Sequence, residues 1–155
     1  APRATRAYPV FRALVSVLIA AGMIAPAAAL EFRSVAENAA VLYDAPSAKA
    51  KKLYIVSSGY PVEIVVMVEG WAKVRDANGD LTWIESKLLT DRRTVMIRVP
   101  QAQVRQSADD NAPVVFQAQQ HVILDLLEVA SAGWLRVRHR DGQTGFIKAS
   151  QIWGA

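Results

Sequence analysis

The sequence contains no cysteine, only two histidines, and no acidic residue before Glu31. Without cysteine the chain has no disulfide, no thiolate metal site and no thiol nucleophile. His121 and His139 are too few to build a zinc or haem site, and neither belongs to a recognisable serine nucleophile motif. No glycine-rich phosphate loop occurs either. We therefore expect no metal, no other cofactor and no enzyme activity.

The positive charge of the chain is concentrated at its beginning. The formal net charge is +4, and Arg3, Arg6 and Arg12 lie in the first twelve residues. From Leu30 onward there are 15 lysines and arginines against 14 aspartates and glutamates. This part is nearly neutral, so we do not expect it to bind nucleic acid, which needs a basic surface to neutralise phosphates.

The segment 1–29 has the pattern of a secretory signal peptide. A basic head ending at Arg12 precedes the uncharged run Ala13–Ala25, and the small residues Ala27 and Ala29 follow. The apolar run is shorter than a membrane-spanning helix, which needs about 20 residues. We predict cleavage after Ala29 and a periplasmic or secreted protein that meets the membrane only transiently. The alternative is a retained N-terminal anchor.

The rest of the chain contains an internal repeat. Gly70-Trp71-Ala72-Lys73-Val74-Arg75 is matched by Gly133-Trp134-Leu135-Arg136-Val137-Arg138. The same spacing relates Asn78-Gly79 to Asp141-Gly142, Trp83 to Phe146, Leu89 to Ile152, Val41 to Val104 and Leu53 to Phe116. Val62–Ile64 aligns with Leu124–Leu126 only after a one-residue shift. This period is too long for a solenoid and predicts two small domains, 30–90 and 94–155, joined by a hinge at Leu89–Arg93.

Each copy has the pattern of short strands separated by turns. Val74 and Val137 alternate with cationic neighbours, so we expect both valines to face inward. Asn78-Gly79 and Asp141-Gly142 are typical of two-residue hairpin turns in which both residues have positive φ. No helical period is evident after Leu30. The pattern predicts an all-β fold made of small barrels or sandwiches.

The string Gly-Trp-x-Lys/Arg-Val-Arg, then Asn/Asp-Gly, then an aromatic residue and Ile, resembles the bacterial SH3 domain family (SH3b). The two copies of the string together cover about Glu31 to Trp153. The resemblance implies two tandem SH3-like β-barrels, in a family whose members are often exported and attach to the cell wall or accompany a separate enzyme. The first copy opens with Ala40–Pro46, similar to the Ala-Leu-Tyr-Asp-Tyr opening of eukaryotic SH3 domains. The second keeps the Val104-Arg105 pair of the bacterial form.

The resemblance also implies a ligand groove lined by aromatic residues. In the first copy the corresponding positions hold Tyr43, Trp71, Trp83, Glu85 and Leu88. In the second copy they hold Gln106, Trp134, Phe146, Lys148 and Gln151. Neither copy has the full aromatic and proline set against which a proline-rich helix packs. We therefore expect a different ligand, bound mainly by the first copy, with the second copy mainly structural.

The tryptophans that follow the glycines have two interpretations. Strand alternation places Trp71 and Trp134 on the same face as neighbouring cations, which favours a groove. The alternative is that each tryptophan closes one end of its core. Trp83 and Phe146 are expected to be partly buried, and Trp153 to pack against its own barrel or across the junction.

Two basic segments are further candidates. Alternation puts Arg136, Arg138 and Arg140 on one strand face next to Trp134, as an anion-contacting strip. Lys49–Lys52 is interpreted as a solvated loop, with contact to anionic wall polymer or lipid as the alternative.

These features predict an exported, non-enzymatic SH3-like binding module. Its expected partner is a peptide, peptidoglycan or an envelope protein. The alternative is a structural or regulatory protein in the envelope, for example one accessory to a cell-wall hydrolase.

Overall fold

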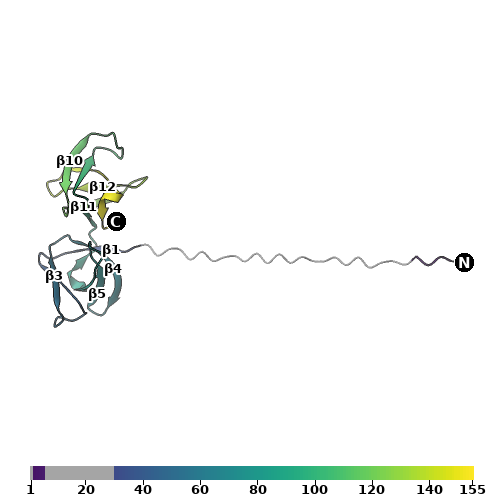
Figure 1. Cartoon of the computed structure of the whole chain (residues 1–155), viewed down its shortest axis with the longest axis horizontal. Coiled ribbons are helices and arrows are strands. Elements are labelled where there is room, and N and C mark those ends of the chain that lie inside the picture. Colours follow the sequence, from purple (N-terminus) through teal and green to yellow (C-terminus); the bar gives the residue numbers. More distant parts are fainter. Residues whose placement is uncertain (1, 6–29) are drawn as a thin grey trace.

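The computed structural model describes residues 2–5 and 30–155, and there it forms two antiparallel sheets of seven strands each (Figure 1). Apart from residues 2–5, the predicted signal peptide 1–29 lies outside the described residues. In the described part of the chain, no helix is long and apolar enough to cross a membrane. The prediction of an all-β fold is confirmed.

The two sheets have the same order of strands. The first contains β1 (Phe32–Val35), β2 (Ala40–Tyr43), β3 (Lys52–Val56), β4 (Pro61–Val68), β5 (Trp71–Arg75), β6 (Leu81–Glu85) and β7 (Leu89–Thr90). The second contains β8 (Thr94–Ile97), β9 (Gln101–Arg105), β10 (Val114–Gln119), β11 (Ile123–Val129), β12 (Trp134–Arg138), β13 (Thr144–Lys148) and β14 (Ile152–Trp153). The 3-10 helices η1 (Ser86–Leu88) and η2 (Ala149–Gln151) precede the last strand of each sheet. The orders β3-β2-β6-β5-β4-β1-β7 and β10-β9-β13-β12-β11-β8-β14 correspond strand for strand.

The strand pairing corrects part of the predicted repeat alignment. Glu63 pairs with Arg75, and Asp125 pairs with Arg138 in the same way. The offset between equivalent residues of the two copies is therefore one residue smaller in the early strands than in the late strands. The extra residue lies in the turn between β11 and β12. There, residues 131–133 lie between Ala130 and Trp134, which share a backbone hydrogen bond. Only residues 69–70 lie between the corresponding pair, Val68 and Trp71, of β4 and β5. The predicted shift of Val62–Ile64 is therefore confirmed.

Two of the predicted equivalences in the early strands are wrong by one position. The residue equivalent to Val104 in the first copy is the buried Leu42, because Leu42 pairs with Tyr54 in the same way as Val104 pairs with Phe116. Val41 therefore does not match Val104, and Leu53 does not match Phe116. A one-residue slip in a strand exchanges its inner and outer faces, so this correction changes which side chains can form a site.

Each sheet has its own apolar core. The first is centred on Leu42, Val74 and Ile84, and the second on Val104, Val137 and Ile147, all at most 1% exposed. The inward placement of Val74 and Val137 is therefore confirmed. Since burial of such a side chain contributes about 1.5–3 kcal/mol, these strands are fixed in register by their inner faces.

The hairpin turns differ from the predicted two-residue form. Gly79 and Gly142 have φ of 85° and 93°, but neither Asn78 nor Asp141 has a positive φ. Instead, the Gly79 N–H donates to the Asp76 carbonyl (2.9 Å), and the Asp76 N–H donates to the Asp80 carbonyl (2.9 Å). This is the wider hairpin in which a left-handed glycine follows an ordinary turn.

The side chain of Asp76 stabilises the wider turn in the first copy. Its carboxylate accepts hydrogen bonds from the backbone N–H groups of Asn78 (3.0 Å) and Asp80 (2.9 Å). Asp76 is buried, and burial raises the pKa of its carboxyl, opposed by these backbone hydrogen bonds.

The two copies are packed together at a junction near the C-terminus (Figure 1). The ring of Phe32 in β1 meets that of Trp153 in β14 edge to face, with centroids 5.3 Å apart. The Thr94 hydroxyl donates to the Gly59 carbonyl (2.6 Å), and an Arg93 guanidinium nitrogen donates to the Gly154 carbonyl (3.2 Å). Part of the predicted hinge is strand β7, which pairs with β1. Of the two placements predicted for Trp153, the structure shows packing across the junction.

Candidate functional site

The aromatic residues predicted for the first copy lie on the outer face of its sheet. Tyr43 pairs with Trp83 across β2 and β6, and Trp83 pairs with Lys73 across β6 and β5. Residues directly opposite in neighbouring strands point to the same face. Trp71 lies two positions from Lys73 and shares that face. We refer to Tyr43, Trp71 and Trp83 as the aromatic face.

The rings of the aromatic face contact one another and a cation. The rings of Tyr43 and Trp71 lie edge to face, with centroids 5.4 Å apart and an interplanar angle of 85°. The Lys73 ammonium lies 6.0 Å from the centre of the Trp83 ring. Trp71 and Trp83 are half-buried, whereas Tyr43 is only 8% exposed. Trp71 is therefore part of an outer layer supported by Tyr43 and does not close one end of the core.

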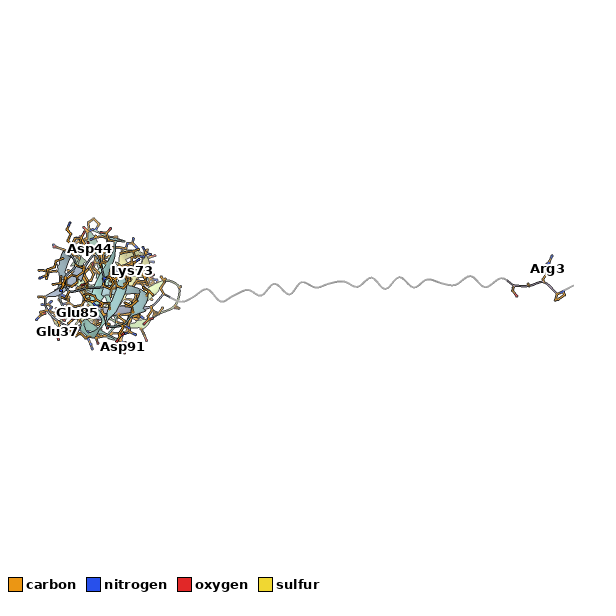
Figure 2. All side chains as sticks on the ribbon, turned by 90° about the horizontal axis from the view of Figure 1, so that it is seen from below. Arg3, Glu37, Asp44, Lys73, Glu85 and Asp91 are labelled. Atoms are coloured by element: carbon orange, nitrogen blue, oxygen red, sulfur yellow. The ribbon has the colours of Figure 1, made fainter. Side chains whose placement is uncertain are left out.

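Two charged side chains border the aromatic face, and Leu88 belongs to the core side. Glu85 pairs directly with Trp71 across β6 and β5, so it lies on the same outer face as Lys73 (both labelled in Figure 2). Glu85 forms an ion pair with Lys87 (3.2 Å). Leu88, predicted for the groove, is half-buried and packs against the first core. The structure thus places four of the five residues predicted for this copy on one face, and only Leu88 lies elsewhere.

In the second copy, the place of Tyr43 is taken by Arg105 and not by Gln106 as predicted. Arg105 pairs with Phe146, as Tyr43 pairs with Trp83. The sequence alignment missed this because the early strands are offset by one position less than the late strands. The only signal for the shift was the looser match around Val62–Ile64. An aromatic position of the first copy is therefore a cation in the second.

The second copy has a polar hollow at the place that corresponds to the aromatic face. Its volume is about 160 Å³. It is lined by Gln101, Gln103, Arg105, Asp110, Trp134, Lys148 and Gln151. Trp134 is only 9% exposed, and the Lys148 ammonium lies 5.8 Å from its ring centre. Phe146 is half-buried beside this site.

Hydrogen bonds hold the cations of this hollow in place. Arg105 donates to the Ala112 carbonyl (2.7 Å) and to the Gln103 side-chain oxygen (2.7 Å). Lys148 forms an ion pair with Asp110. The hollow therefore presents fixed cations and carboxamides above a tryptophan, which suits polar groups such as carboxylates and amides better than proline rings.

The predicted arginine strip is divided by the structure. Arg138 and Arg140 line a hollow of about 150 Å³ that also includes Arg92, whereas Trp134 lines the polar hollow. Arg136 pairs with Phe146 and Glu128 and lines neither hollow. Strand β12 ends at Arg138, so Arg140 lies in the following turn and the predicted alternation stops there.

An exposed apolar surface on the first copy was not predicted. Strand β3 is the edge of its sheet, and its residues Lys52, Leu53, Tyr54 and Ile55 line a shallow hollow of about 450 Å³. Ile55 is 73% exposed. The sequence signal was the apolar run Leu53–Val56, whose edge position follows only from the sheet order.

The two histidines lie in different turns: His121 between β10 and β11, and His139 directly after β12. His139 lies 3.1 Å from an Asp141 carboxylate oxygen, and its ring is 5.6 Å from that of Phe116. The pKa of Asp141 is lowered, chiefly by the backbone N–H of Gln143 and also by His139. Across residues 2–5 and 30–155, no cluster of histidine and acidic side chains is suited to holding a metal.

Comparison with known proteins gives a family match to both copies. The family described as bacterial SH3 domain matches residues 36–91 and 98–154. Among solved structures, NlpC2 from Trichomonas vaginalis is 17% identical with a TM-score of 0.38, over 81% of this chain and 48% of that chain. An NlpC/P60 family protein from Bacillus cereus is 16% identical with a TM-score of 0.37, over 79% and 56%. The chain thus spans about half the length of these structures. No curated protein matches its sequence.

Proposed function

Because this chain belongs to the bacterial SH3 domain family, which matches it twice in tandem, we propose that it is a binding module of the bacterial cell envelope. Its ligand is a peptide-like component, of which the peptide part of peptidoglycan is our first candidate. The primary contact is the aromatic face of the first copy. Binding takes place without catalysis by this chain.

The aromatic face is the observation that carries this proposal. The core beneath it is filled by Ala72, Val74 and Ile84, each 0% exposed. Trp71 and Trp83 are nevertheless only half-buried above that core. Partly exposed tryptophans supported by a second ring resemble the aromatic anchors that dominate binding energy at interfaces. Lys73 and Glu85 beside them supply one charge of each sign for the ends of a peptide-like ligand.

The polar hollow of the second copy supports a secondary contact. Arg105 and Lys148 outnumber Asp110 there, so the hollow favours a carboxylate, and its glutamines match amide groups. Peptidoglycan peptides carry both kinds of group. We infer that the second copy adds a polar contact, in addition to its structural role.

The fuller architecture is also part of the proposal. We infer that each sheet curls into an SH3-like barrel, because β1 pairs with both β4 and β7, and β8 with both β11 and β14. The domains are 30–90 and 94–155, preceded by a signal peptide cleaved after Ala29. The protein acts in the periplasm or outside the cell.

A regulatory role is the second candidate function. The exposed edge strand β3 offers unpaired backbone groups and apolar side chains to a protein partner. In this version the chain is a structural or regulatory partner of another envelope protein, such as a wall hydrolase. A crosslinking experiment that captures one dominant protein through β3, with no retention on peptidoglycan, would favour it.

The proposed function is tested by binding to purified peptidoglycan. The purified chain is incubated with insoluble peptidoglycan, and the bound fraction is measured after sedimentation. We expect Trp71→Ala to weaken the apparent affinity by about 2 kcal/mol, or roughly 30-fold, as loss of an aromatic anchor does. Ile55→Ser is the control, because Ile55 is exposed and belongs to β3, which contributes no residue to the aromatic face. Equal retention of both variants, or no retention of the wild type, contradicts the proposal.

A further inference from the structure

A charged pocket at the junction between the two copies is not used by the proposed function. It has a volume of about 150 Å³ and is lined by Ser57, Ser58, Gly59, Arg92, Ile123, Asp125, Arg138 and Arg140. We call it the junction pocket. We propose that it is a binding site for a small oxyanion, a carboxylate or a phosphate, which bridges the two copies and the connection between them.

Three separate parts of the chain build the junction pocket. The serines come from the turn after β3, Arg92 from the connection 91–93, and the other arginines from β12 and its turn. Hydrogen bonds hold these parts together: Thr94 donates to the Gly59 carbonyl (2.6 Å), and Ser34 donates to the Arg92 carbonyl (2.6 Å). The walls of the pocket are therefore supported by contacts outside it.

Asp125 shows how the arginines are arranged. One carboxylate oxygen of Asp125 accepts hydrogen bonds from Arg92 Nε (3.0 Å) and Nη2 (2.6 Å). The other oxygen lies 3.4 Å from Arg138 Nη2. A single carboxylate thus holds two guanidinium groups beside each other and occupies only some of their N–H donors, which leaves the others for an oxyanion.

The pocket keeps an excess of positive charge. Three arginines face one carboxylate, and Arg140 forms no ion pair with any residue in the described ranges 2–5 and 30–155. The three arginines are exposed, so solvent screens much of their mutual repulsion, and an anion binds them mainly through charge-assisted hydrogen bonds. The Ser57 hydroxyl is available as a further donor, whereas the Ser58 hydroxyl already donates to the Ala36 carbonyl (3.2 Å).

The size of the pocket limits the ligand. The pocket has a volume of about 150 Å³. This space suits a small group such as a carboxylate or a phosphate. A ligand held by both copies and by Arg92 stabilises the packed junction, since it binds only when the three parts are together.

The test uses the whole chain with two probes, inorganic phosphate and acetate, each titrated at constant ionic strength against chloride. We expect at least one of them to raise the melting temperature saturably and to shift the amide NMR signals of Ser57 and Ser58. Phosphate alone identifies a phosphate ligand, acetate alone identifies a carboxylate, and a response to both identifies a general oxyanion site.

Two variants separate this site from general charge effects. Arg140→Gln should weaken the affinity for the responding anion at least about tenfold, whereas Arg98→Gln should change it less than about twofold. Arg98 is the matched control because it is also exposed at the junction but lines a different hollow. Arg140→Lys should give an intermediate affinity, since it keeps the charge but not the planar fork.

Two results would overturn the proposal. One is a wild-type protein that responds to phosphate and acetate no more than to chloride. The other is an equal loss of affinity in Arg140→Gln and Arg98→Gln, which would indicate a diffuse charge effect. The site does not depend on the aromatic face, so Trp71→Ala should leave the anion response unchanged.

Discussion

Removing Phe32 should uncouple the two copies. Its ring is 6% exposed, contacts Trp153 edge to face, and lies under the Arg93 guanidinium at 5.7 Å. Phe32 belongs to neither of the two core clusters. Loss of a fully buried phenylalanine costs about 3–5 kcal/mol, of which an aromatic pair accounts for about 0.5–1.5. We therefore expect Phe32→Ala to destabilise the protein by about 3 kcal/mol, mostly at the junction.

Calorimetry distinguishes loss of the junction from general destabilisation. If residues 30–155 unfold as one unit, the enthalpy at the melting temperature is about 90 kcal/mol, at about 0.7 kcal/mol per residue. The calorimetric and van't Hoff enthalpies of the wild type should then be equal. In Phe32→Ala each copy should unfold separately, so the calorimetric enthalpy should approach twice the van't Hoff value.

Phe116→Ala is the matched control for this experiment. Phe116 packs against the second core and takes no part in the junction. Its loss should lower the melting temperature but keep a single transition. A wild type that already shows two transitions, or a Phe32→Ala protein that loses less than about 1 kcal/mol and keeps one transition, would refute the account of the junction.

Two further predictions concern the junction and the first hairpin turn. Gly154→Ala should lower the free energy of unfolding by about 1–3 kcal/mol in urea denaturation, because Gly154 has φ of 115° and an added Cβ would lie 2.8 Å from the Thr94 carbonyl oxygen; unchanged stability would contradict this packing. Burial raises the pKa of Asp76 in the folded state, so the folded protein binds that proton more tightly than the unfolded chain. The contribution of Asp76 to the free energy of unfolding should therefore be greatest below about pH 4 and decline as the pH rises through the raised pKa. Denaturation curves recorded from about pH 3.5 to 7 measure this dependence, which Asp76→Asn should lack.

The strand pattern and the repeat could be read from the sequence because their signals are local. Gly70-Trp71 and Gly133-Trp134 mark the same strand start in both copies, and the alternation around Val74 predicts its inward orientation. The extra residue in the turn between β11 and β12 could not be located in the same way. The repeated string fixes the alignment only on its C-terminal side, so Gln106 was predicted where the structure places Arg105.

The sites that depend on distant contacts were beyond sequence reasoning. Arg138 and Arg140 were identified as anion-contacting residues, but their neighbours Ser57 and Arg92 come from other parts of the chain. Only the packing of the copies brings these residues together. The hairpin turns were also predicted too tight, because both copies form the same wider turn, closed by backbone hydrogen bonds from Asp76 to Asp80 and from His139 to Gln143, which the Asn-Gly or Asp-Gly pattern does not reveal.

The aromatic face is tested most directly by the indole N–H signals of the four tryptophans in an NMR titration with soluble peptidoglycan fragments. Trp71 and Trp83 lie on the aromatic face, Trp134 lines the polar hollow, and Trp153 is held at the junction against Phe32. The account predicts saturable shifts for Trp71 and Trp83, a smaller shift for Trp134 and none for Trp153. Four unchanged signals, or a shift confined to Trp153, would contradict it.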